Sequence, residues 1–228
     1  MRSAKHGMRT LGLAILVVTG VMAVGATGAQ GQLPGESKSG TYLVNLAPAL
    51  LAIIEAKQIG ITSFLVPARS FEIKCTAFHI EGKISTSTDA EGKLVSLGCL
   101  SFDLMSGEIL PCDMKTLGTV TAKVLVLPIL HSGEPFLLFE PLPGETNFTT
   151  VAFKGGTECT LPLNNAINGS ISAKVDELDA VEQLILYSEE IQLLTGDKLA
   201  FGLNQAYIDR HAIGFLVGSH EGQKIGVH

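Results

Sequence analysis

Four cysteines are the residues of this 228-residue chain whose type and spacing most directly predict chemistry. They are Cys75, Cys99, Cys112 and Cys159. A structural zinc site needs close pairs such as C-x-x-C with further ligands nearby, and the sequence contains no such pair. The same absence gives no support to a thioredoxin-like redox role. An even number of cysteines in an exported chain favours disulfides, so we predict two disulfides and neither a metal ion nor a cofactor.

Four cysteines can pair in three ways, and we predict the pairs Cys99–Cys112 and Cys75–Cys159. The segment between Cys99 and Cys112 contains Ser106-Gly107, which is typical of a turn and would bring two strand ends together. The segments 75–85 and 159–172 share C-T followed by G-x-I-S, which indicates either a worn internal duplication or a chance match. A duplication would place Cys75 and Cys159 in related positions.

Histidines could supply acid–base chemistry, but no motif organises them. The sequence contains neither G-x-S-x-G, which is typical of serine hydrolases, nor H-E-x-x-H, which is typical of zinc proteases. A secreted hydrolase with a non-standard site is therefore the third hypothesis for function. It requires His79, His131 or His211 to converge with a carboxylate in one cleft.

The stretch LHSGEPFLLFEPLPGETNF, residues 130–148, could form a contact with a ligand or partner. Its candidate residues are His131, Glu134, Phe136, Phe139 and Glu140. One interpretation is a buried strand at FLLF between loops bounded by prolines, which short apolar runs favour. The other is an exposed apolar loop that binds a partner or a lipid.

The N-terminus predicts export. Arg2, Lys5 and Arg9 precede an uncharged apolar run at 11–24, and small residues follow. This order is typical of a secretory signal peptide, which we place at residues 1–28, and the alternative is an uncleaved anchor. A flexible lead-in at 29–40 and a single β-rich domain at 41–228 would follow. We predict an extracellular or cell-envelope location and no transmembrane span after the signal peptide.

The charge balance argues against nucleic acid as a partner. The chain has 16 Lys and Arg residues against 22 Asp and Glu residues. The first 28 residues hold three of the basic residues and none of the acidic ones, so 13 basic and 22 acidic residues remain, a net charge of −9. Such an acidic surface is repelled by phosphate backbones.

Strands outnumber helices in the periodicity of the chain. In 71–77 the residues Phe71, Ile73, Cys75 and Ala77 alternate with polar ones, which predicts a half-buried strand with Cys75 inward. The segment 167–175 alternates in the same way, and 119–128 becomes apolar on both faces before Pro128, which should end it. Further candidate strands are 41–46, 61–66, 81–87, 93–102, 148–153, 183–188, 198–207 and 211–217.

Two segments have helical features. SEEIQLLTGD, from residue 188, has a capping serine, two early acidic residues and a closing glycine. The segment 48–58 fits a helix and a strand equally well. The fold class that these patterns predict is all-β: an antiparallel sandwich or barrel of many short strands with one or two short helices.

The strings FLVPARSFEIKCTAF, GKLVSLGCLSF, AKVLVLPILHSGEPFLLFEPLPGE and LAFGLNQAYIDRHAIGFLVGSHEGQKIGV resemble a group of uncharacterised exported bacterial β-rich proteins with four cysteines, over roughly residues 60–227. More remotely, the cysteine layout is similar to that of secreted activator-of-alkane-oxidation proteins. The first resemblance brings no known activity and therefore no functional residue. The second implies an extracellular or cell-surface role.

Three hypotheses for function follow. The first is a secreted or envelope-associated, non-catalytic β-protein that acts through surface interactions with a protein, a surface or an apolar small molecule. The second is a carrier of a small apolar ligand inside a β-barrel, which an enclosed cavity of several hundred Å³ would favour. The third is the hydrolase described above.

Overall fold

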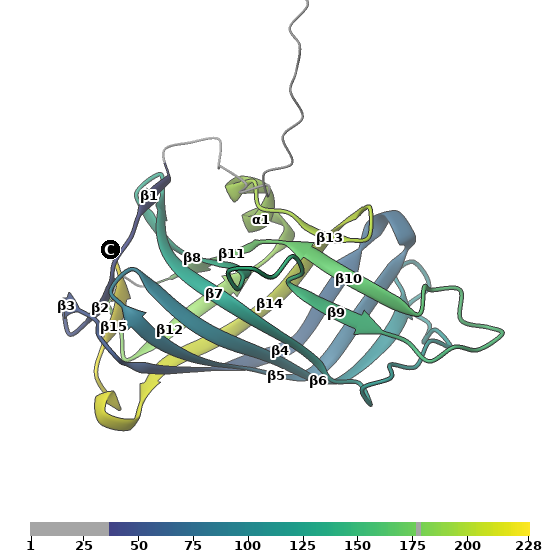
Figure 1. The fold of residues 1–228 in the computed structure, drawn as a ribbon, viewed down its shortest axis with the longest axis horizontal. Coiled ribbons are helices and arrows are strands. Elements are labelled where there is room, and N and C mark those ends of the chain that lie inside the picture. The colour runs from purple at the N-terminus through teal and green to yellow at the C-terminus, as the bar shows by residue number, and fades with distance from the viewer. Residues whose placement is uncertain (1–36, 177–178) are drawn as a thin grey trace, which may run out of the picture.

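Eight antiparallel strands form a closed barrel in the part of the chain that this computed structural model describes, residues 37–176 and 179–228 (Figure 1). In order around the barrel they are β12 (Glu182–Tyr187), β11 (Ile171–Val175), β8 (Glu134–Pro141), β7 (Val120–His131), β6 (Asp89–Asp103), β5 (Phe71–Thr86), β4 (Ile53–Val66) and β14 (Asn204–Val217). Pairing of β12 with β14 closes the ring. The all-β prediction is confirmed, in its barrel form. The predicted signal peptide, residues 1–28, lies outside the described residues.

Shorter strands extend the barrel or cover its ends. β13 (Leu199–Phe201), β10 (Asn164–Gly169) and β9 (Thr149–Ala152) continue in succession from β14, and β1 (Ser37–Ser39) pairs with β7. β15 (Ile225–Val227), β2 (Tyr42–Val44) and β3 (Ala47–Pro48) form a separate sheet at one end of the barrel (Figure 1). Within the lead-in expected at 29–40, residues 37–39 form β1, and the Gly40 N–H donates to the Pro128 carbonyl at 2.9 Å.

The separate sheet closes its end of the barrel by packing into it. Tyr42, Ile225 and Val227 are buried, and the Tyr42 hydroxyl donates to the Val126 carbonyl of β7 at 3.1 Å. Burial raises the pKa of Tyr42 above its usual value, so the hydroxyl keeps its proton. Segments from both ends of the described chain therefore seal one mouth.

Several strands are longer than the sequence indicated, because some glycines bend strands and do not end them. Gly60 lies inside β4 with φ at +80°, within a shift of the β4–β5 register. Gly98 lies inside β6 with φ at +61°, opposite Thr76 of β5. The alternation of β5 changes phase there: Phe71, Ile73 and Cys75 are buried as predicted, but Ala77 is exposed and Phe78 is buried. The register shift at Gly60 is a bulge, and such bulges bend strands around a barrel.

Two predicted strand limits are wrong for local reasons. Pro128 does not end β7, which runs to His131. β7 pairs with β6 as far as Val126, and its pairing with β1 begins at Ile129, so Pro128 lies in the gap between these two neighbours. The predicted strand 167–175 is two strands, because the chain turns at Gly169, where φ is +98° and an added Cβ would lie 1.8 Å from the Lys198 carbonyl oxygen.

The structure also decides the two segments for which the sequence had helical features. α1 (Glu189–Thr195) begins as predicted, with the Ser188 hydroxyl accepting from the Ile191 N–H at 3.1 Å and Gly196 in the left-handed conformation. The segment 48–58 is not helical: it leaves β3 at Pro48, bends at Leu51, where φ is +55°, and enters β4 at Ile53. Two 3₁₀ turns, Pro67–Arg69 and Gly218–His220, complete the helical elements of the described chain. Within these residues no helix has the length and apolar character of a membrane span.

Candidate functional site

The two disulfides join Cys75 to Cys99 and Cys112 to Cys159, so the predicted pairing is wrong. Cys75 and Cys99 face each other directly in the β5–β6 ladder, with their Cα atoms 3.9 Å apart. The predicted turn at Ser106-Gly107 does form, with the Gly107 N–H donating to the Asp103 carbonyl at 2.9 Å, but it does not bring Cys99 to Cys112. All four thiols are paired, which fits an oxidising environment.

Phe136 and Phe139 lie in the core, so the buried-strand interpretation of the 130–148 stretch is confirmed. Both side chains are fully buried on β8. His131, at the end of β7, is also buried and meets the Phe136 ring edge-on at 6.0 Å between centroids. The exposed apolar loop of the alternative interpretation is not formed.

The two glutamates of this stretch lie apart from that apolar cluster. Glu134 is exposed and its carboxylate lies 2.7 Å from the Lys174 ammonium. Glu140 lines an open groove of about 800 Å³ with Lys198. Partial burial, and next the nearby Asp197, raise the pKa of Glu140. The five predicted residues therefore do not form one site.

The histidines of the hydrolase hypothesis do not meet in a cleft of the described structure. His79 is on the outer face of β5, 3.7 Å from Glu81, and His211 is exposed on β14. His131 packs in the core against Phe136. Among residues 37–176 and 179–228, no group of three or more His, Cys, Asp or Glu side chains is arranged to hold a metal ion.

One end of the barrel has an apolar groove beside the disulfides. β6 continues past Ser96, its last residue paired with β7, and the segment 104–119 covers the free edge. The N–H of Leu110 donates to the Ser101 carbonyl at 2.8 Å, and the N–H of Cys99 donates to the Gly118 carbonyl at 2.9 Å.

The groove between this edge and the covering segment measures about 340 Å³. Leu100, Ile109 and Leu117 line it with 48, 64 and 87 % of their surface exposed. We call these three residues and their groove the disulfide-end face. Cys112–Cys159 ties the covering segment to the loop that precedes β10.

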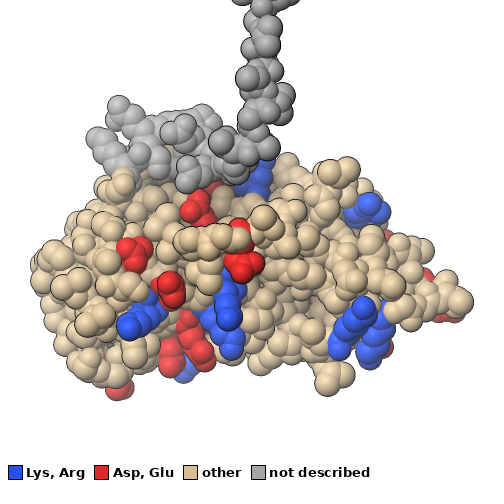
Figure 2. Space-filling model, in the orientation of Figure 1, with Lys and Arg blue, Asp and Glu red and all other residues tan. Residues whose placement is uncertain are grey.

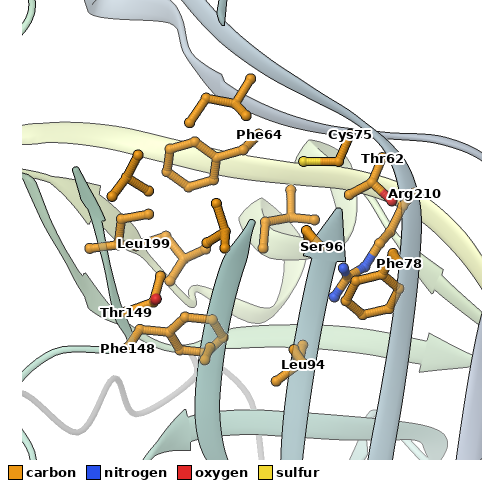
Figure 3. Close-up of a pocket in the computed structure, with 16 residues that line it drawn as sticks. Thr62, Phe64, Cys75, Phe78, Leu94, Ser96, Phe148, Thr149, Leu199 and Arg210 are labelled. Atoms are coloured by element: carbon orange, nitrogen blue, oxygen red, sulfur yellow. The ribbon is translucent and has the colours of Figure 1, made fainter. Parts of the chain in front are cut away.

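The barrel interior is almost filled by side chains. Among the described residues it holds cavities of about 60 and 50 Å³, both with mainly apolar walls. Pockets that bind drug-sized ligands measure roughly 300 to 1,000 Å³, so neither cavity has the size that we set as favouring an apolar carrier. Figure 3 shows the larger cavity, with Phe64, Leu94 and Phe148 around it and Arg210 at one side.

Arg210 is the residue in this interior that the sequence analysis missed. It occupies an inward position on β14 and is 4 % exposed. Its guanidinium carbon lies 3.3 Å from the centroid of Phe78 and 4.3 Å from that of Tyr187, its direct partner across β12 and β14. Its Nε and Nη2 atoms are buried without a hydrogen-bond partner among the described residues. Burial lowers the pKa of Arg210 to about 10, so the group is charged at neutral pH.

The fold and these sites define the class of the protein: a disulfide-bonded, antiparallel eight-stranded β-barrel with a nearly filled interior. Comparison with family models, with curated proteins and with solved structures finds no match.

Proposed function

We propose that the protein is an exported, non-catalytic β-barrel that acts through its surface, and that the disulfide-end face contacts its partner. The predicted signal peptide and the two disulfides support export. The observation that carries the proposal is the shared exposure of Leu100 on β6 and of Ile109 and Leu117 on the covering segment, which a disulfide fixes. Apolar side chains that cluster on a rigid surface are typical of interaction sites.

The chemistry of this face favours a protein partner. The groove has room for one or two side chains, as do the pockets that hold anchor residues in protein interfaces. An anionic membrane fits less well, because it attracts excess Lys and Arg and this chain is acidic overall. Figure 2 shows basic and acidic side chains interspersed on the visible face, without a continuous basic patch. The proposed partner is thus a protein that inserts an apolar side chain into the groove.

The test is site-specific photocrosslinking in the producing cells. A photoreactive residue at Leu117 should give one discrete protein adduct, which Ile109→Glu in the same chain removes. The matched control is the same photoreactive residue at Leu203, an equally apolar and fully exposed position on another turn. Equal adducts from both positions, adducts to lipid only, or no adduct at Leu117 would each contradict the proposal.

The non-catalytic part has its own test. A hydrolase screen of the purified mature protein should find no turnover that depends on a single side chain. Turnover abolished by substituting His79, His131 or His211 would favour the hydrolase hypothesis instead.

A further inference from the structure

The segment that joins β2 to β4 turns its larger apolar side chains outward. In the run Ala49-Leu50-Leu51-Ala52 both alanines are buried, whereas Leu50 and Leu51 keep 63 and 66 % of their surface exposed. Leu46, on the same segment, is 66 % exposed. Folding alone favours the opposite arrangement, because a leucine gains more from burial than an alanine does. We call Leu46, Leu50 and Leu51 the leucine tip.

The backbone of the leucine tip is held in a conformation that leucine disfavours. The φ angle is +65° at Leu46 and +55° at Leu51, in the left-handed region that is uncommon for residues other than glycine. Residues that the surrounding structure holds in such conformations are frequent at functional sites. The fold thus keeps these leucines in water at a conformational cost as well.

The polar groups of this segment already have partners within the protein. Asn45 is the only polar side chain from 43 to 54, and its Oδ1 accepts a hydrogen bond from the Lys224 N–H at 3.1 Å. The N–H groups of Asn45 and Ala49 donate to the carbonyls of Lys224 and Tyr42, at 3.0 and 2.8 Å. Pro48 has no N–H to satisfy. Internal partners of this kind are what an apolar surrounding requires, because it supplies none of its own.

Strand pairing with a second copy or with a peptide fits this segment poorly. Such pairing uses the free N–H and C=O groups along the edge of a sheet. The edge strand here is β3, which has only two residues, and one of them is Pro48. The tip therefore offers side chains to a partner and hardly any backbone.

The absence of charge distinguishes a lipid surface from a protein surface. No residue from 40 to 54 is charged, whereas protein interfaces surround their apolar centre with a polar rim. The segment also projects from the end of the barrel and does not form a groove with a neighbour (Figure 1). The hydrocarbon of a bilayer needs neither a rim nor a matching shape, since it yields around apolar side chains that enter it.

We propose that the leucine tip inserts into a bilayer of uncharged, zwitterionic lipid and so docks the protein on a membrane surface. The tip has no Lys or Arg with which to attract anionic headgroups, so its affinity comes from apolar burial.

The tip and the disulfide-end face lie at opposite ends of β6. The Tyr42 N–H donates to the Ser87 carbonyl at 2.6 Å, which places the sheet of the tip beside the β5–β6 turn. Leu100 of the disulfide-end face lies ten residues beyond Ala90, which is roughly 30 Å of extended strand. Lipid and a protein partner can therefore be bound together, and either proposal can fail without the other.

The first test is flotation of the full mature chain with phosphatidylcholine vesicles. The wild type should float with the vesicles, and the double variant Leu50→Ser/Leu51→Ser should bind about 100-fold more weakly, because burying each leucine contributes about a factor of ten. The matched control is Leu193→Ser/Leu194→Ser, which removes two neighbouring leucines of α1 that are 58 and 54 % exposed. This control should bind as the wild type does.

A second measurement uses the absence of tryptophan from the chain. A single tryptophan in Leu50→Trp should emit at shorter wavelength on the vesicles and be quenched by brominated phosphatidylcholine. The control Leu203→Trp, at a fully exposed position on another turn, should show neither change. Binding should be equal at low and high salt and should not increase when anionic lipid is added, because the tip is uncharged.

Several results would overturn the proposal. These are no flotation of the wild type, equal binding of the wild type and Leu50→Ser/Leu51→Ser, unchanged emission of Leu50→Trp on vesicles, and binding that requires anionic lipid. A lipid-free dimer that Leu50→Ser/Leu51→Ser dissociates would assign the tip to a second copy of the chain and would overturn it as well. Flotation that persists while the crosslink at Leu117 fails would remove the proposed protein partner alone.

Discussion

The interior around Arg210 and the disulfide-end face depart from the usual distribution of residues in opposite directions. The interior buries a charge without a described counter-ion, and the face exposes three large apolar side chains to water. The two departures differ in energy, because desolvating a charge costs far more than leaving a leucine exposed. The buried charge should therefore reduce stability, whereas the face should be nearly neutral for stability.

The largest effect is expected from opening the disulfide that fixes the disulfide-end face. Replacing Cys112 and Cys159 by alanine opens a link across 47 residues, which in the chain-entropy model lowers the free energy of unfolding by about 4 kcal/mol. Hydrogen exchange should accelerate in 109–118 while the amides of β12 and β14 around Arg210 keep their protection. Denaturant unfolding and exchange mass spectrometry measure both results. Equal loss of protection in the two regions would show that they are one cooperative unit.

Next in size is removal of the interior charge. Arg210→Met should stabilise the protein by about 1 to 3 kcal/mol, because buried charges replaced by apolar side chains of similar size often give such gains. Leu117→Ser, the matched change on the disulfide-end face, should alter stability by no more than about 0.5 kcal/mol. Urea unfolding of the three proteins tests the contrast. Destabilisation by Arg210→Met would mean that the guanidinium is structurally satisfied in the folded protein.

A smaller effect should show how the interior tolerates its charge. Phe78→Leu removes a ring 3.3 Å from the guanidinium carbon. In a double-mutant cycle with Arg210→Met, the coupling between the two positions should be about 1 to 2 kcal/mol, as expected for a desolvated cation–π contact. A coupling near zero would indicate that Phe78 acts only as packing.

Local patterns in the sequence were sufficient for the elements but not for the two regions. Alternation placed Phe71, Ile73 and Cys75 on the inner face, and the capping serine placed α1. The disulfides required the register of a long hairpin, which depends on where its turn lies. Counting outward from the Thr86–Asp89 pair would place Leu100 opposite Cys75, and only the register shift between Ile84 and Thr86 brings Cys99 there.

Arg210 was missed because it falls in the gap between two predicted strands. Ile208, Asp209 and Arg210 separate the predicted strands 198–207 and 211–217, whereas β14 runs unbroken through them. Alternation does carry a signal: Ala206, Ile208 and Ala212 share a buried face, and Arg210 lies on it. The cavity itself could not be predicted, because it depends on side chains from strands distant in sequence.

The smallest effect concerns Glu140, a partly buried carboxylate that water can still reach. Burial raises the pKa of Glu140, so the folded state binds its proton more tightly than the unfolded state does. Stability therefore falls as the pH rises from the unfolded pKa through the folded one, and the loss persists at neutral pH. Glu140→Gln should be more stable than wild type at pH 7, by no more than about 0.5 kcal/mol because solvent screens this site. Below the unfolded pKa, near pH 4, the difference should vanish. Thermal unfolding at both pH values measures it, and a wild-type advantage at pH 7 would show that ionised Glu140 has a favourable partner, unlike Arg210.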